Sequence, residues 1–273
     1  MTDRYAVIGN PIAHSRSPLI HAAFAQQTGQ NLSYERLLAP LTGFAATLRQ
    51  FQAEGGRGVN VTVPFKEEAW RLSDELTPRA QLAQAANTLV FTDTGILADN
   101  TDGAGLIADL KQNLHFPLIR RRVLLMGAGG AARGVIAALL AEQPLLVVIA
   151  NRTVSRATAL QQRFSPYGIV EACDYAALQG LQFDCVINAT AASLAGESIP
   201  LPDTLFAPGS LAYDMMYGDQ PSTFLRFAGL HGATLCADGL GMLVEQAAVA
   251  FHLWRKVHPE TQPVIAQLHS KYI

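Results

Sequence analysis

Cysteine and charged residues are both scarce in this chain. It has 3 Cys in 273 residues, and Asp, Glu, Lys and Arg together make up 15%. An odd number of cysteines cannot pair completely, and Cys173, Cys185 and Cys236 have no close Cys or His at metal-site spacing. We therefore expect buried free thiols in a reducing cytoplasm, and neither a disulfide framework nor a metal site.

Positive charge is not in excess, and no apolar stretch is long enough to span a membrane. The chain has 20 Lys and Arg against 22 Asp and Glu, a formal net charge of -2. So balanced a charge does not attract polyanions, and we expect no nucleic-acid partner. The most apolar window, residues 123–141, is interrupted by Arg133 and by glycines, whereas a bilayer span needs roughly 20 apolar residues. Since the first apolar run is also too short for a signal peptide, we expect a cytoplasmic protein without a membrane partner.

The chain has the length and apolar content of two α/β domains. It is 49% hydrophobic over 273 residues, and a domain typically takes roughly 100 to 200 residues. In the first part, strand and helix patterns alternate, which predicts a mainly parallel sheet with one antiparallel edge. The expected strands are residues 5–8, 32–38, 58–63 and a hairpin of 88–91 with 96–98, and the expected helices are 18–27, 41–54, 65–72 and 78–85.

The second part begins after a connecting helix at residues 104–114. Six strand patterns follow, which suit a doubly wound sheet. They lie at residues 123–126, 145–150, 169–172, 185–187, 211–214 and 234–236. A long helix at 240–257 and one more after Pro259 complete the chain, and we expect the last helix to return to the first domain.

A glycine-rich turn follows the first strand of the second part. The sequence is Gly127-Ala128-Gly129-Gly130-Ala131-Ala132. It matches the G-x-G-x-x-A pattern, in which small residues let the backbone approach a pyrophosphate at a helix N-terminus. The alternative interpretation is a tight turn that only packs the helix on the strand.

The residues after the next strand indicate which dinucleotide would bind. An NAD site would place Asp or Glu there to accept a hydrogen bond from the ribose. The chain has Asn151-Arg152-Thr153 instead, with Arg156 nearby. Guanidinium groups can neutralise a 2'-phosphate, so the sequence favours NADP over NAD. Alternatively, Asn151 is an ordinary turn residue and the arginines are solvated.

Two serines follow the first strand of the chain. Ser15 and Ser17 flank Arg16, and Pro18 suits the first position of a helix. We expect Ser17 to be the N-cap of that helix, and the hydroxyls and amides at such a helix start also suit a bound carboxylate. His14 is interpreted as a structural residue rather than a catalyst.

Lys66 lies in the predicted first turn of the helix that begins after Pro64. The positive end of the helix dipole disfavours an ammonium group there, whereas Glu67 and Glu68 suit it. Positive potential and partial burial make such a lysine a candidate proton shuttle near neutral pH. The alternative interpretation is a solvated lysine.

The segment 99–103, Asp-Asn-Thr-Asp-Gly, joins the hairpin to the connecting helix. An EF-hand frame on Gly103 puts Ala98 at the first ligand position, so we reject a calcium site. Asp102 can be a helix N-cap, yet it lies at a predicted domain junction, where small substrates commonly bind. Asn87 similarly has two interpretations, as the cap of a turn or as a residue of a binding site.

Together these segments resemble the shikimate dehydrogenase family in order and spacing over essentially the whole chain. The segments that carry the resemblance are residues 9–18, 60–66, 86–88, 99–103, 127–133, 151–153, 188–190 and 238–243. The resemblance implies an α/β fold of two domains, with a substrate-binding and catalytic domain at residues 1–103 and 238–273. It also implies a Rossmann NADP-binding domain at residues 104–237.

The resemblance implies an oxidoreductase that reversibly reduces 3-dehydroshikimate to shikimate with NADPH, in aromatic amino-acid biosynthesis. Lys66 and Asp102 would be the catalytic pair. The implied substrate-binding residues are Ser15, Ser17, Thr62, Asn87, Tyr217 and Gln246. The implied cofactor-binding residues are Gly127, Ala128, Gly129, Gly130, Ala131, Asn151, Arg152, Thr153, Arg156, Met215 and Gly239. A homodimer is compatible with this interpretation, although the sequence does not set the oligomeric state.

Two segments depart from the family pattern. Ala22 stands where an Asn commonly follows the histidine, and Ala191-Ala192-Ser193 follows residues 188–190. Neither belongs to the implied catalytic set. Two other functions stay open: an NAD-dependent quinate/shikimate dehydrogenase, for which an Asp would be expected at Asn151 or Arg152, and a non-catalytic NADPH-binding sensor, which would need neither Lys66 nor Asp102.

Overall fold

The structure is a computed structural model that describes residues 2–190 and 199–270. It divides into two compact units, one formed by Met1–Gly105 with Leu243–Ile273 and the other by Leu106–Met242. These bounds lie a few residues beyond those expected from the sequence. In the described part of the chain, none of the helices has both the length and the apolar character needed to cross a membrane.

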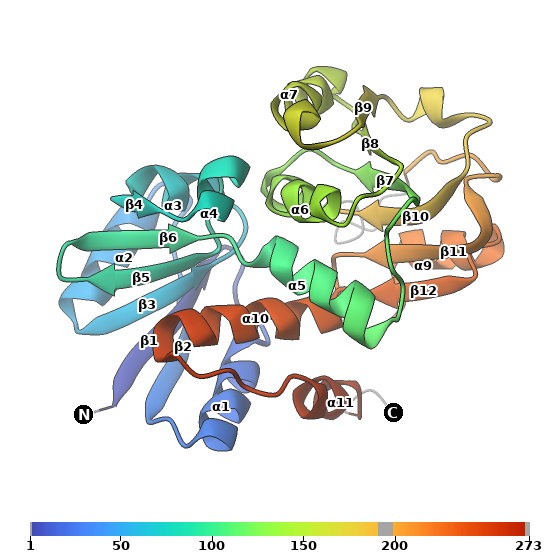
Figure 1. The fold of residues 1–273 in the computed structure, drawn as a ribbon. Coiled ribbons are helices and arrows are strands. Elements are labelled where there is room, and N and C mark those ends of the chain that lie inside the picture. Colours follow the sequence, from blue (N-terminus) through green and yellow to red (C-terminus); the bar gives the residue numbers. More distant parts are fainter. Residues whose placement is uncertain (1, 191–198, 271–273) are drawn as a thin grey trace. The chain divides into compact units, whose positions relative to one another are not determined.

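The first unit is built on a six-stranded sheet in the order β2-β1-β3-β5-β6-β4 (Figure 1). Its strands are β1 (Asp3–Gly9), β2 (Leu32–Leu38), β3 (Gly56–Val61), β4 (Glu75–Leu76), β5 (Thr88–Thr92) and β6 (Gly95–Asp99). Only β5 runs against its neighbours β3 and β6. The prediction of an antiparallel edge was therefore wrong, because β5 lies between β3 and β6, and the unpredicted strand β4 pairs parallel with β6 at the edge.

The central strand β1 carries a continuous apolar run, Tyr5 to Ile8, whose side chains are buried on both faces of the sheet. Ala6 and Ile8 face a cluster with Phe44 and Phe65. On the other face, Tyr5 stacks on Trp254 at 4.6 Å between ring centroids. The helices of the unit are α1 (Ser17–Thr28), α2 (Phe44–Ala53), α3 (Lys66–Leu72), α4 (Pro78–Ala83), most of α10 (Leu240–Arg255) and α11 (Gln262–Ser270).

The last helix packs in the first unit, as expected from the sequence. In the segment before α11, Glu260 exchanges two hydrogen bonds with the side chain of Gln27 at the end of α1. Figure 1 shows α1 and α11 side by side. Arg255, the last residue of α10, forms an ion pair with Asp3 at the start of β1. These contacts join the C-terminal segment to the N-terminal strand and helix.

The second unit is built on a parallel sheet in the order β12-β11-β10-β7-β8-β9 (Figure 1). Numbered within the unit, this is the 3-2-1-4-5-6 order of a Rossmann fold read from the other edge, with the strand order reversing between β7 and β10. The strands are β7 (Arg122–Met126), β8 (Leu146–Ala150), β9 (Val170–Cys173), β10 (Phe183–Asn188), β11 (Phe206–Asp214) and β12 (Leu235–Asp238). Ligands of such sheets bind at the carboxyl ends of the strands beside this reversal.

The helices of the second unit follow their strands directly. They are α6 (Gly130–Ala141), α7 (Val154–Phe164) and α9 (Thr223–Leu230), with short 3-10 turns at Ser165–Tyr167 and Ala176–Leu178. The connecting helix α5 (Asp102–Ala108) continues as a π-helical turn over Asp109–Asn113. In that turn the Asp109 carboxylate accepts a hydrogen bond of 2.5 Å from the hydroxyl of Tyr213 on β11.

Two local predictions need correction. Ser17 is not the N-cap of α1 but its first residue, because Arg16 takes the N-cap position without a side-chain cap. The Ser15 hydroxyl instead accepts a hydrogen bond of 3.3 Å from the backbone N–H of Ser17. The three cysteines are free, but only Cys185 is buried, whereas Cys173 is half-buried and Cys236 is exposed. Burial raises the pKa of the Cys185 thiol to about 12.

Of the two departures from the family pattern, Ala22 is exposed on α1 and takes no part in the core. The departure at 191–193 lies outside the described residues.

Candidate functional site

Polar side chains gather at one end of the sheet of the first unit. Strands β1, β3 and β6 run the same way, and their carboxyl ends lead into the segments that carry Ser15, Lys66 and Asp102. Because β5 is antiparallel to them, its first residues are at this same end, and Asn87 comes just before it. The sheet topology therefore collects residues from four separate segments of the chain.

Lys66 and Asp102 form an ion pair within the first unit. The Nζ atom of Lys66 is 2.5 Å from Oδ2 of Asp102, and their side chains are 16% and 7% exposed. Each is the first residue of a short helix, Lys66 of α3 and Asp102 of α5. The positive end of a helix dipole favours the carboxylate of Asp102 and disfavours the ammonium of Lys66. The ion pair with Asp102 therefore offsets the unfavourable interaction of Lys66 with its own helix. The pair presents a proton donor and an acceptor at one point.

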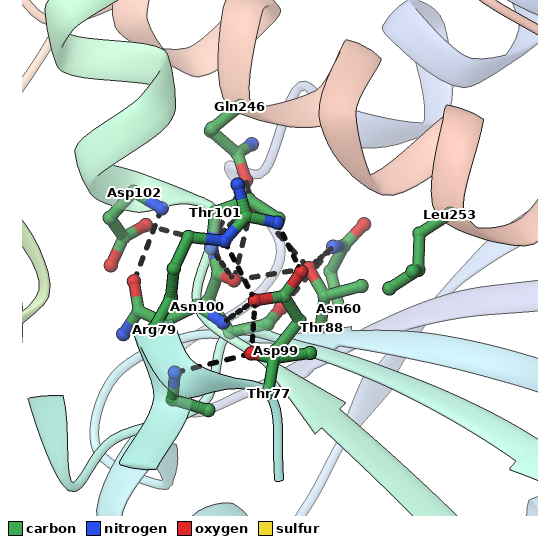
Figure 2. Close-up of polar contacts among 12 residues, drawn as sticks. Asn60, Thr77, Arg79, Thr88, Asp99, Asn100, Thr101, Asp102, Gln246 and Leu253 are labelled. Carbon is green, nitrogen blue, oxygen red and sulfur yellow. Dashed lines mark hydrogen bonds and ion pairs between the residues drawn. The ribbon is translucent and has the colours of Figure 1, made fainter. Parts of the chain in front are cut away.

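Asn87 links this ion pair to helix α10. Its Nδ2 is within hydrogen-bond distance of Asp102 Oδ1 at 2.8 Å, Thr101 Oγ1 at 2.9 Å and Gln246 Oε1 at 3.1 Å. An amide nitrogen has only two hydrogens, so these three acceptors compete for them. Figure 2 shows Gln246 reaching this network from α10 while Asp102 and Thr101 come from the turn after β6. The hydrogen bonds of Asn87 fix the second oxygen of Asp102.

The two serines lie close to one another after β1. The hydroxyl of Ser15 donates to that of Ser17 over 3.2 Å. The guanidinium group of Arg36 on β2 donates two hydrogen bonds, of 2.9 and 2.7 Å, to the backbone carbonyl of Ser15. His14 beside them is exposed. Arg36 thus holds the loop that carries the serine hydroxyls.

Thr62, another predicted substrate residue, follows β3. Its backbone N–H donates to the carbonyl of Ile8 on β1, over 2.9 Å. The methyl group of Thr62 also packs against Gly9 so closely that an added Cβ on Gly9 would overlap it. Gly9 therefore allows the segments after β1 and β3 to lie against one another.

Residues that were not predicted as site residues connect these groups. Tyr34 donates a hydrogen bond of 2.7 Å to Asn60 Oδ1, and Asn60 Nδ2 lies 3.1 Å from the hydroxyl of Thr88. That hydroxyl is 3.0 Å from Asn87 Oδ1. Although part of Tyr34 is exposed, burial of its hydroxyl end raises its pKa well above the ordinary value, against the effect of Ser17. Asn60 and Thr88 lie inside motifs that carry the family resemblance, whereas Tyr34 gave no signal in the sequence.

His21 is a fully buried residue beside this network. Its ring stacks on that of Tyr34 with 4.2 Å between centroids, and neither ring nitrogen has a hydrogen bond of standard geometry in the described part of the chain. Burial lowers the pKa of His21 to about 3, and the nearby Asn60 side chain opposes this only in part. The imidazole therefore stays neutral at physiological pH.

The glycine turn of the second unit lies at the point where its strand order reverses. Gly127 directly follows β7 and has a φ of 107°, which a residue with a side chain rarely adopts. A Cβ added at Gly129 would meet nothing within 4 Å. The backbone at Gly129 is thus open on that side, and α6 begins at Gly130. These residues fit a dinucleotide pyrophosphate at the helix N-terminus.

Basic side chains lie beyond the next strand. The side chains of Arg152 and Arg156 are exposed in the segment between β8 and the first turn of α7. The Asn151 side chain donates to the carbonyl of Thr153 over 2.8 Å, which holds the turn between them. This placement leaves both guanidinium groups accessible to an anionic ligand such as a 2'-phosphate.

Met215 and Gly239 meet at the carboxyl ends of β11 and β12. An added Cβ on Gly239 would overlap the carbonyl of Met215, so glycine is required for this approach. The backbone N–H of Met215 donates to the carbonyl of Asn188 at the end of β10, over 2.9 Å. Tyr217, predicted as a substrate residue, is half-buried in the segment after β11. The second unit thus brings these residues to the same sheet end as the glycine turn.

A metal centre is not evident from the geometry. In residues 2–190 and 199–270, no three or more His, Cys, Asp or Glu side chains are grouped so that they could hold an ion.

The Rossmann strand order with its glycine turn is typical of units that bind dinucleotides, the cofactors of many oxidoreductases. The other unit supplies a Lys–Asp pair that could exchange a proton. Comparisons with known families are more specific. Three family models match: the shikimate dehydrogenase substrate binding domain at residues 7–89, shikimate / quinate 5-dehydrogenase at 109–195, and the shikimate 5'-dehydrogenase C-terminal domain at 239–269.

Individual relatives match over the whole chain. Shikimate dehydrogenase (NADP(+)) of Dechloromonas aromatica is 57% identical over 273 residues, which is 100% of each chain. The crystal structure of an Ael1 enzyme from Pseudomonas putida is similar with a TM-score of 0.91 and 49% identity, over 98% of each chain. Shikimate 5-dehydrogenase from Thermus thermophilus, solved in complex with NADP(H) and shikimate, has a TM-score of 0.86 and 33% identity over 100% of each chain. The chain belongs to the shikimate dehydrogenase family.

Proposed function

We propose that this protein is an NADP-dependent shikimate dehydrogenase that reversibly reduces 3-dehydroshikimate to shikimate in aromatic amino-acid biosynthesis. The observation that carries the proposal is the contact of Lys66 with Asp102 at the carboxyl end of a sheet, in a chain whose relatives are named for this activity. Proton transfer and substrate binding, except by Tyr217, are assigned to the first unit, and cofactor binding to the second.

Lys66 is the proton donor in the direction of reduction. A ketone that becomes an alcohol needs a proton on its oxygen, and an ammonium held beside that oxygen supplies it. In the reverse direction the amine of Lys66 takes the proton back. Asp102 keeps the ammonium in place through the 2.5 Å contact and accepts a hydrogen bond from a substrate hydroxyl. The two side chains thus both orient the substrate and exchange its proton.

The remaining polar residues hold the substrate. Ser15 and Ser17 bind its carboxylate, since their hydroxyls lie 3.2 Å apart on a loop held by Arg36. The residues that contact its hydroxyls are Thr62, Asn87, Tyr217 and Gln246. Hydrogen bonding to several hydroxyls favours substrates that carry them all, because a missing partner leaves a buried polar group unsatisfied.

The second unit binds the dinucleotide through the glycine turn and the segment after β8. NADPH supplies the hydride when it is bound. Gly127 to Ala131 approach the pyrophosphate, and Met215 with Gly239 line the cofactor site. Arg152, aided by Asn151, Thr153 and Arg156, binds the 2'-phosphate, which explains a preference for NADP without an acidic residue at that position.

The direct test follows the absorbance of NADPH as it forms from NADP in a reaction of purified protein with shikimate. Separate reactions replace shikimate by quinate, or NADP by NAD. We expect fast reduction of NADP with shikimate and much slower turnover with quinate or with NAD. Turnover dominated by quinate and NAD would support the rival dehydrogenase instead. Turnover with neither acid, despite NADPH binding, would support a sensor.

A cytoplasmic location and a homodimer complete the proposal. Cell fractionation tests the location, and size-exclusion chromatography with light scattering tests the oligomeric state. A mass equal to that of one chain would exclude the dimer.

A further inference from the structure

Asp99 is a buried carboxylate three positions before Asp102, and it has no place in the proposed reaction. Its side chain is 1% exposed. Oδ1 accepts hydrogen bonds from the Thr77 hydroxyl at 2.6 Å, the Asn100 backbone N–H at 2.7 Å and Arg79 Nε at 3.1 Å. Oδ2 pairs with the other end of the Arg79 guanidinium group. A charge buried this deeply is tolerated only because it is paired and hydrogen-bonded.

Asp99 is connected to both Asn87 and Asp102, which contact one another in the proposed site. Its backbone carbonyl accepts the N–H of Asn87 over 3.1 Å. The next residue, Asn100, accepts the backbone N–H of Asp102 through Oδ1 at 3.2 Å and donates to the carbonyl of Ala85 through Nδ2 at 2.9 Å. Figure 2 shows this network between Thr77 and Asp102. The position of Asp99 therefore sets the backbone of Asn87 and Asp102 together.

Arg79 is the part of this network that comes from outside the sheet. It lies on α4, directly after Pro78, and α4 is capped by Thr77, whose hydroxyl accepts the N–H of Ala80 at 3.3 Å. The Arg79 side chain is 48% exposed, so its guanidinium reaches from solvent to the buried carboxylate. Both Nε and Nη2 engage Asp99, a two-point contact that fixes direction as well as charge.

We infer that Arg79 is a positioning residue for Asn87 and Asp102, acting through Asp99. The inference rests on the proposed function, since it assigns these residues to substrate binding and catalysis. Without Arg79 the buried carboxylate of Asp99 loses its only cationic partner among the described residues in contact with it. The carboxylate must then turn toward water, and this turn moves the backbone between Asp99 and Asp102, to which Asn87 is also bonded.

The inference predicts a particular kinetic pattern. A variant that is only less stable loses active enzyme, which lowers kcat but leaves both KM values unchanged. A variant with displaced Asn87 and Asp102 raises KM for shikimate and lowers kcat, while KM for NADP stays the same. Displacement of catalytic groups by an ångström can lower rates by about 100-fold.

The experiment compares Arg79→Ala, Arg79→Gln and Arg79→Lys with wild type and with the control Arg71→Ala. Arg71 is a 65% exposed arginine on α3 that pairs with Glu67 over 3.5 Å and has no contact with Asp99. We expect kcat/KM for shikimate to fall about 10- to 100-fold in Arg79→Ala and Arg79→Gln, with partial recovery in Arg79→Lys. Millimolar guanidinium ion should also restore part of the activity of Arg79→Ala, and not alter that of Arg71→Ala.

Hydrogen exchange supplies a readout that does not require turnover. The backbone N–H groups of Asn87 and Asp102 are bonded to the Asp99 carbonyl and the Asn100 side chain, so they should exchange faster in Arg79→Ala and Arg79→Gln than in wild type. If the wild-type protein does not oxidise shikimate, the proposed function is refuted. Hydrogen exchange in the Arg79 variants would still test whether Arg79 positions Asn87 and Asp102. The inference would be overturned if hydrogen exchange at Asn87 and Asp102 were the same in Arg79→Ala as in wild type. It would also be overturned if kcat/KM of Arg79→Ala were within twofold of that of Arg71→Ala.

Discussion

The ammonium of Lys66 lies 2.5 Å from the carboxylate of Asp102, although 36 positions separate the two residues in the chain. Each begins a helix, and each follows a strand of the same sheet. Contacts between sequence neighbours do not produce this pair. It arises because β3 and β6 run in the same direction, with antiparallel β5 between them.

Replacement of Lys66 by alanine should abolish most turnover. Loss of a positioned proton donor typically costs about 100- to 10,000-fold in rate, so we expect kcat to fall within that range. Because Lys66 is in the first unit and the proposed cofactor residues are in the second, the affinity for NADPH should stay nearly the same. Steady-state kinetics and NADPH fluorescence titration measure the two quantities. Lys111→Ala, at an exposed surface pair with Glu142, is the control. Wild-type turnover in Lys66→Ala would remove this residue from the mechanism.

Replacement of Arg152 by alanine should reduce the preference for NADPH over NADH. A charge-assisted hydrogen bond is worth about 1.5 to 3 kcal/mol, which corresponds to roughly 10- to 150-fold in affinity. We expect NADPH to bind more weakly by about that factor, and NADH to bind almost as before, in parallel titrations. Arg226→Ala on α9 is a control, since Arg226 instead donates to the carbonyl of Pro221. An unaltered ratio of the two affinities would refute the role of Arg152 at the 2'-phosphate.

His21 should make the protein less stable in mild acid. The pKa of His21 is about 3 in the folded protein against an ordinary value of 6.5, because burial disfavours the charged form. Between these pH values the unfolded chain binds more protons, so stability falls as pH decreases from 6.5 toward 3. Between pH 7 and pH 5 this linkage costs about 2 kcal/mol of unfolding free energy.

The variant His21→Phe keeps an aromatic ring against Tyr34 but cannot titrate. Urea unfolding at pH 7 and pH 5 should therefore show a smaller loss of stability for the variant than for wild type, by about 2 kcal/mol. The comparison uses the change with pH within each protein, so an altered packing energy at pH 7 does not affect it. Equal losses in both proteins would show that His21 is not the source of the acid sensitivity.

Glycine at position 9 should be essential for the packing of the site. The added methyl group of Gly9→Ala would overlap that of Thr62 and lie 3.0 Å from Cδ1 of Ile12. Overpacking of this kind typically costs about 1 to 3 kcal/mol, and we expect KM for shikimate to rise as Thr62 moves. Gly229→Ala is the matched control, because nothing lies within 4 Å of its added Cβ in helix α9. Thermal unfolding should show lower stability for Gly9→Ala and no loss for Gly229→Ala, and equal stability of the two variants would contradict this argument.

Most strands and helices could be predicted because their signals are local. Short apolar runs that alternate with helix patterns indicated all six strands of the second unit, and the glycine turn indicated the start of α6. The two-residue strand β4 was missed because it has too few residues for a pattern. The interior position of β5 was missed because it depends on which strands pair across long stretches of chain.

The sequence by itself determined the kinds of chemistry available: a small-residue turn before a helix, basic residues after the second strand of the second unit, and one lysine at a helix start. Only the tertiary structure decided which of these groups meet. The contact of Lys66 with Asp102, the enclosure of Asp99 by Arg79 and the depressed pKa of His21 all depend on distance and on exclusion of water. Both are properties of packed elements that lie far apart along the chain, so no local pattern specifies them.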